Sequence, residues 1–190
     1  KETGEKLSDE NIRFQIITFL IAGHETTSGL LSFAINYMLS NPEVLRKATA
    51  EVDRVFGSDV NRVPNYKDMS ELKYINQILK ETLRLWPPAP GFRLAPYNDT
   101  VVAGKYHIEK DQPIMVLAPS LHRQKDVWGD NPELFDVDNF SKENEEKRPP
   151  NSYKPFGNGV RACIGRQFAM VEAQLVLAMI LHKYRLINHT

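Results

Sequence analysis

The chain has 190 residues, enough for one good hydrophobic core or for a large part of a bigger domain. Lys and Arg together number 24 and Asp and Glu together number 24, so there is no basic excess to predict a nucleic-acid partner. The single cysteine excludes an internal disulfide framework and fits a reducing compartment. The most apolar stretch, residues 16–23, is far shorter than the about 20 residues of a membrane-spanning helix, so no membrane anchor is predicted in this segment.

Three helices are predicted in the first half of the chain. Ser8 can cap a helix that we expect to run from residue 9 to about residue 39. Asn41-Pro42 begins a second helix, which is expected to end near residue 56 before a glycine. A third helix is expected over residues 72–86, because two prolines follow it directly.

The second half of the chain mixes short strands with one further helix. Strand-like runs occupy residues 101–102, 106–108 and 114–117, separated by turn residues. The charged, proline-containing segment 141–152 is interpreted as a surface loop. A helical pattern returns over residues 164–183. The predicted fold class is therefore mainly α with a small β portion.

A glycine-rich segment, Phe156 to Gly165, surrounds the only cysteine. Glycine permits positive φ and a close approach of the backbone to a bulky flat molecule. Because a helix is expected to follow at once, Cys163 lies where free helix N–H groups stabilise a thiolate. Arg161 adds a cation suited to a carboxylate. From residue types alone, a buried structural cysteine remains the alternative.

Two further groups of polar residues occur on predicted helices. Ala22 to Thr27 places a glycine, an acid and two hydroxyls in the middle of the helix that looks most buried; an ordinary polar face is the alternative. Thr26 can donate a hydrogen bond to a carbonyl one turn earlier. On the third helix, Glu81 and Arg84 are neighbours at i, i+3, and periodicity alone predicts a solvated ion pair opposite the apolar stripe.

Taken together, these motifs resemble the cytochrome P450 family. The spacing Phe-x-x-Gly-x-Arg-x-Cys-x-Gly over residues 156–165 matches the haem-binding segment of that family. The resemblance implies that Cys163 is the axial thiolate ligand of the iron of a heme b. It assigns further haem contacts to Ala22, Arg93, Phe156, Gly157, Arg161, Ile164 and Gly165.

The resemblance also implies roles for the two helical motifs. The segment from Ala22 to Thr27 is similar to the groove in which the family binds O₂, with Thr26 and Glu25 as the catalytic pair that relays protons. Glu81 and Arg84 resemble a buried pair that scaffolds the cysteine loop. In the family a downstream arginine completes that pair, whereas Asn139 stands at this position here. We therefore predict that Asn139→Arg raises thermal stability.

The residues in these motifs are most similar to those of the self-sufficient fatty-acid hydroxylases, in which a flavin reductase is fused to the haem domain. This implies that residues 1–190 are the C-terminal portion of the haem domain of a cytoplasmic monooxygenase. It would use O₂ to hydroxylate a medium- to long-chain fatty acid, with FAD, FMN and NADPH bound by a reductase outside this chain. Ala89 and Phe92 match positions that approach the substrate.

Three alternatives remain open at the level of the sequence. A haem-thiolate isomerase or dehydratase would need no O₂, although the Glu25–Thr26 pair argues against it. A cysteine-nucleophile hydrolase would need a histidine close to Cys163. A fragment of this length that binds no haem by itself is the third. The five histidines show no metal-ligand spacing and are interpreted as surface or packing residues.

Overall fold

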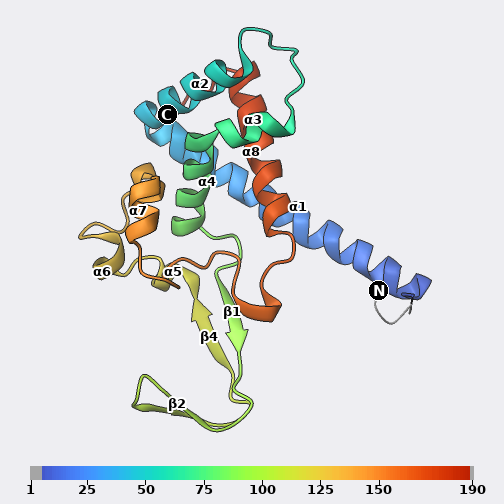
Figure 1. The fold of residues 1–190 in the computed structure, drawn as a ribbon, viewed down its shortest axis with the longest axis vertical. Coiled ribbons are helices and arrows are strands. Elements are labelled where there is room, and N and C mark those ends of the chain that lie inside the picture. Colours follow the sequence, from blue (N-terminus) through green and yellow to red (C-terminus); the bar gives the residue numbers. More distant parts are fainter. Residues whose placement is uncertain (1–5, 189–190) are drawn as a thin grey trace.

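The computed structural model describes residues 6–188, and within them helices predominate over four short strands (Figure 1). The fold class predicted from the sequence is therefore confirmed. In chain order the elements are α1 (Asp9–Ser40), α2 (Pro42–Phe56), α3 (Tyr66–Glu71), α4 (Lys73–Leu85), β1 (Gly91–Leu94), β2 (Thr100–Val102), β3 (Tyr106–Ile108), β4 (Ile114–Leu117), α5 (Ala118–Leu121), α6 (Lys125–Trp128), the 3-10 turn η1 (Val137–Phe140), α7 (Lys142–Lys147), the 3-10 turn η2 (Gly159–Arg161) and α8 (Arg166–Lys183).

The longest helix, α1, begins where the sequence predicts. The Ser8 hydroxyl accepts a hydrogen bond from the Asn11 N–H (3.2 Å), which satisfies one of the free donors at the helix start. Only the second half of α1 is buried, whereas the large apolar side chains of residues 12–21 are exposed. That first half extends past the other helices (Figure 1), so the interpretation of α1 as the most buried helix is wrong there.

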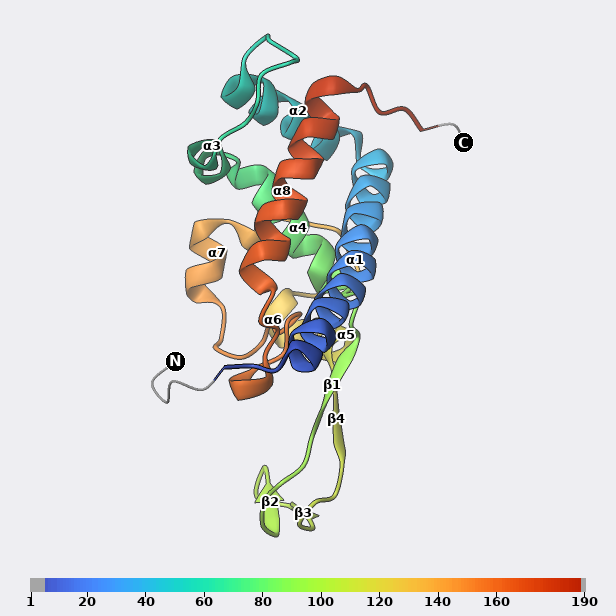
Figure 2. The ribbon, with the colours of Figure 1, turned by 90° about the vertical axis from the view of Figure 1, so that its right-hand side faces the viewer.

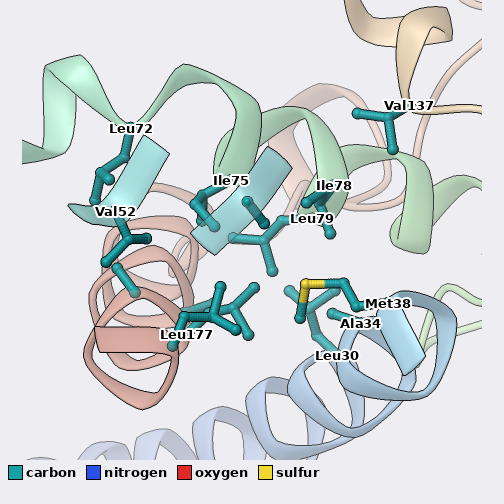
Figure 3. Close-up of a cluster of buried hydrophobic side chains, with 14 of the residues drawn as sticks. Leu30, Ala34, Met38, Val52, Leu72, Ile75, Ile78, Leu79, Val137 and Leu177 are labelled. Carbon is teal, nitrogen blue, oxygen red and sulfur yellow. The ribbon is translucent and has the colours of Figure 1, made fainter. Parts of the chain in front are cut away.

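The core lies between the second half of α1 and helices α2, α4 and α8. Figure 3 shows its central side chains: Leu30, Ala34 and Met38 of α1, Val52 of α2, Leu72 with Ile75, Ile78 and Leu79 along α4, Val137, and Leu177 of α8. Burying one side chain of this size contributes about 1.5–3 kcal/mol. Because α4 supplies the largest share of these side chains, the core fixes the helix that carries Glu81 and Arg84.

Two antiparallel ribbons project from the helical part of the molecule (Figures 1 and 2). β1 pairs with β4, so that Gly91 lies opposite Leu117 and Leu94 opposite Ile114. β2 pairs with β3 across the turn at residues 103–105, where Ala103 and Gly104 both have positive φ. The three predicted strands are confirmed as β2, β3 and β4.

The sequence prediction misses helices α3, α5, α6 and α7 and strand β1. Residues 142–147 form α7 within the segment interpreted as a surface loop, because the Ser141 hydroxyl caps the Asn144 N–H and acidic residues occupy the first turn. The short helix α3, capped reciprocally by Asn65 and Asp68, is not predicted. Strand β1 is also missed, because its pairing partner β4 lies about twenty residues away and no local signal specifies it.

Candidate functional site

The cysteine loop, residues 156–165, is closed by hydrogen bonds within its own backbone. The Cys163 N–H donates to the Phe156 carbonyl (2.9 Å), and the Ala162 N–H donates to the Gly159 carbonyl (3.1 Å). Gly157 and Gly159 have φ of 73° and 69°, a conformation that residues with a side chain rarely adopt. Gly157 and Gly159 therefore have a conformational reason to be glycine, and the backbone hydrogen bonds fix the position of Cys163 within the loop.

Cys163 is exposed, and so are the apolar side chains of Val160 and Ile164 beside it. Helix α8 begins three residues later, at Arg166, with Gly165 as its N-cap. Its first helical hydrogen bond runs from the Ala169 N–H to the Gly165 carbonyl (2.8 Å), so the preceding N–H groups have no partner within the helix. The alternative prediction, that Cys163 is a buried structural cysteine, is wrong because the residue is exposed.

Strand β1 brings one of the two predicted substrate residues, Phe92, to the cysteine loop. A Cβ built on Gly157 would lie 4.0 Å from Cδ1 of Phe92, which is half-buried. Arg93, one residue later, is exposed, as is Ala89 before the strand. Figures 1 and 2 show the loop that precedes α8 next to the start of β1. Phe92 and the cysteine loop are thus brought together by the fold.

The predicted proton-relay residues lie on the exposed stretch of α1. The Thr26 hydroxyl donates to the Ala22 carbonyl (2.7 Å), as expected for a threonine one turn later in a helix. Ala22, Glu25 and Thr26 are all exposed, and within residues 6–188 no hydrogen bond joins them to the cysteine loop. The neighbouring Thr27 is buried, and its hydroxyl lacks a hydrogen-bond partner among the described residues.

Glu81 and Arg84 form a buried ion pair, both at 0% exposure. The guanidinium donates two hydrogen bonds of 2.7 Å to the carboxylate, and Glu81 also accepts from the Asp136 N–H (2.8 Å) and from the Asn139 amide (3.2 Å). Burial raises the pKa of the Glu81 carboxyl, and these hydrogen bonds act against that rise. The solvated pair predicted from periodicity is therefore wrong, and the buried pair implied by the resemblance is confirmed.

Arg84 extends this pair into the neighbouring segments. Its guanidinium donates to the carbonyls of His122 (3.1 Å), Pro132 (2.6 Å) and Leu134 (2.8 Å), and it lies 5.0 Å from the centre of the Trp128 ring. All these partners are distant in the sequence. The pair thus ties α4 to the segment between α5 and η1.

Sequence reasoning misses one buried polar residue in this network. His122 is interpreted from the sequence as surface or packing, yet it is fully buried and hydrogen-bonded through both ring nitrogens. Its partners are backbone groups of Arg84 and Lys154, which no spacing in the sequence relates to it. Only the fold makes its position visible.

The sequence model of the cytochrome P450 family matches residues 1–190, the whole chain. The chain belongs to the cytochrome P450 family. It is 59% identical to a bifunctional cytochrome P450/NADPH–P450 reductase of Bacillus cereus over 189 residues, which are 99% of this chain and 17% of that protein. A second such protein, from Bacillus subtilis, is 58% identical over 188 residues, again 99% of this chain and 17% of the relative.

A self-sufficient cytochrome P450 monooxygenase of Aspergillus niger is 49% identical over 185 residues, which cover 97% of this chain and 17% of that protein. The chain therefore spans about 17% of the length of these curated relatives. Among the described residues, none of the helices combines the length and the apolar character needed to cross a membrane.

Members of this family hold a haem, and the residues around Cys163 fit one. The thiol is exposed, and the two positive-φ glycines before it carry no side chain that would keep a flat ring at a distance. Val160 and Ile164 offer exposed apolar surface, and Arg161 offers an exposed cation for a carboxylate. Within residues 6–188 no group of three or more His, Cys, Asp or Glu residues could hold a metal ion, so a single cysteine sulfur suits haem iron better than a zinc site.

Proposed function

We propose that the chain is the C-terminal part of the haem domain of a monooxygenase that uses O₂ to hydroxylate an apolar substrate. The observation that carries this proposal is the exposed thiol of Cys163, which lies inside a closed glycine-containing loop and three residues before the start of α8. The thiolate is the form in which a cysteine binds a metal, and an exposed sulfur is accessible to one. Membership of the cytochrome P450 family supports the same assignment.

Cys163 is the proposed axial ligand of a heme b. When bound, the haem supplies the reduction and cleavage of O₂, which the electron density of a thiolate ligand favours. Phe156, Gly157, Ile164 and Gly165 are the proposed haem contacts within the cysteine loop, and Ala22 is the proposed contact from α1. Arg161 and Arg93 are the proposed partners of the haem carboxylates, since both guanidinium groups are exposed and able to pair.

Glu25 and Thr26 are proposed to deliver the protons that the reduction of O₂ consumes. The Thr26 hydroxyl donates its hydrogen to the Ala22 carbonyl. The lone pairs of its oxygen can therefore accept a hydrogen bond from a water molecule. Glu25 is exposed, and a carboxylate in that position can exchange protons with solvent and pass them to such a water.

The proposed substrate is a medium- to long-chain fatty acid, with Ala89 and Phe92 as its contacts. The aromatic ring of Phe92 approaches Gly157 of the cysteine loop, where it offers half-buried apolar surface. The electrons are proposed to come from NADPH through a reductase with FAD and FMN, because the Bacillus relatives are named as fusions with an NADPH–P450 reductase. A cytoplasmic location, which the resemblance implies, is part of the same proposal.

The test uses the haem-loaded protein that contains this chain, an NADPH–P450 reductase, NADPH, dodecanoic acid and isotopically labelled O₂. We expect a hydroxylated acid that carries the label, and no product when NADPH is omitted. A product that forms without O₂ or NADPH would instead support an isomerase or dehydratase. Failure of the loaded protein to hydroxylate any chain length would overturn the fatty-acid assignment.

A further inference from the structure

His122 occupies a buried position between two segments that the proposed function requires. It follows α5 directly and its side chain is fully buried, with the rings of Tyr153 and Trp128 centred 5.1 and 6.5 Å away. An apolar side chain of similar size would fill such a space at least as well. Because burying a polar imidazole costs free energy, its presence here indicates that the two ring nitrogens make hydrogen bonds that an apolar side chain could not make.

Both ring nitrogens are paired with backbone groups. Nδ1 lies 3.1 Å from the Arg84 carbonyl, and Nε2 lies 2.9 Å from the Lys154 N–H. A carbonyl only accepts and an N–H only donates, so the imidazole is neutral, carries its hydrogen on Nδ1 and accepts at Nε2. Burial supports this state, since it lowers the pKa of His122 to about 4. In return, the Arg84 guanidinium donates to the His122 carbonyl (3.1 Å).

The Lys154 backbone passes this connection to the cysteine loop. Its N–H is held by His122, and its own carbonyl accepts the N–H of Gly157 (3.2 Å), the first positive-φ residue of the loop. Phe156, between them, accepts the N–H of Cys163 (2.9 Å). A continuous series of hydrogen bonds thus runs from the buried Glu81–Arg84 pair through His122 to the backbone that carries the thiol.

We propose that His122 is a positioning residue for Cys163: it couples the buried ion pair to the start of the cysteine loop and so fixes the thiol against the iron. The inference rests on the proposed function, in that Cys163 is taken as the iron ligand. The hydrogen bond between Nε2 of His122 and the Lys154 N–H is the contact on which this inference depends. The Nδ1 contact alone would tie His122 to α4 without reaching the loop.

The test compares two amides that separate the roles of the ring nitrogens. In His122→Asn the amide reaches only the place of Nδ1, whereas in His122→Gln its oxygen reaches the place of Nε2 and accepts from the Lys154 N–H. The readout is the Soret band of the reduced, CO-bound haem protein, which is strongly red-shifted when a thiolate is the ligand. We expect His122→Gln to keep most of that band and His122→Asn to lose most of it.

Amide hydrogen exchange supplies a second readout that needs no bound CO. Exchange of residues 154–163 should be faster in His122→Asn than in His122→Gln, because only the former leaves the Lys154 N–H unpaired. His182→Asn is the matched control: His182 also contacts a backbone carbonyl, that of Asp59 (3.0 Å), at a site outside the cysteine loop, and it should leave both readouts unchanged.

Equal bands and equal exchange in His122→Asn and His122→Gln would overturn the positioning role. That result differs from failure of the proposed function, which would appear as a parent protein without the red-shifted band. If His122→Asn does not fold, the inference still fails when His122→Gln folds but loses the band, because that variant retains the acceptor for Lys154.

Discussion

Replacing Arg84 by lysine keeps the buried charge but removes the shape of the guanidinium. Arg84 makes five hydrogen bonds, two to Glu81 and one each to the carbonyls of His122, Pro132 and Leu134. A lysine ammonium has three N–H donors, so at least two of these five acceptors lose their partner. At about 0.5–1.5 kcal/mol for each hydrogen bond, the free energy of unfolding should fall by about 1–3 kcal/mol. The further cost of an unpaired buried carboxylate is avoided because the charge remains.

The measurement is urea unfolding of the haem-loaded protein, followed by circular dichroism and by release of the haem. The same change at Arg46, whose guanidinium makes two hydrogen bonds to Glu43 on the exposed surface of α2, is the matched control and should leave the midpoint unchanged. An Arg84→Lys protein with the midpoint of its parent would refute the argument that the fork of the guanidinium, rather than its charge alone, holds the network together.

Three further predictions follow from the same structure. Thr26→Ala should divert electrons from hydroxylated product to hydrogen peroxide, measured as product formed per NADPH consumed; Ser32→Ala, which also removes a hydroxyl bonded one turn back in α1, should not. Asn139→Arg should raise the melting temperature, because burial raises the pKa of the Glu81 carboxyl and a second cation stabilises its charged form; an unchanged or lower value contradicts this. Burial lowers the pKa of His122 from 6.5 to about 4, so on acidification the unfolded chain binds the proton before the folded protein does. The free energy of unfolding should therefore fall by about 3 kcal/mol between pH 6.5 and 4. In His122→Gln, the urea midpoint should lack this part of its dependence on pH.

The long helices α1, α2, α4 and α8 could be predicted because their signals are local. Ser8 caps α1, Pro42 begins α2 and the two prolines after α4 end it, so the boundaries agree with the structure to within about two residues. The strand β1 could not be predicted, because its pairing with β4 is a tertiary contact. The exposure of the first half of α1 was equally invisible, since an apolar run indicates a face that can be buried and does not say which element covers it.

The candidate site, like the fold, could be predicted only in part from the sequence. The cysteine loop is recognisable because five of its residue types are fixed within ten positions, and Gly157 and Gly159 in it have positive φ. The burial of Glu81 and Arg84 contradicts their periodicity, because their partners lie at residues 122–139 and come together only in the fold. His122 carries no sequence signal at all for the same reason, as both of its partners are backbone groups.

The central claim, that Cys163 is the axial ligand of a haem, is tested most directly by the CO complex of the reduced protein. We expect the protein that contains this chain to show the strongly red-shifted Soret band of thiolate-ligated haem, and Cys163→Ala to lose it. Far-ultraviolet circular dichroism of the variant should remain that of the parent, since the exposed thiol makes no packing contribution to the core. A Cys163→Ala protein that keeps the red-shifted band would contradict the account.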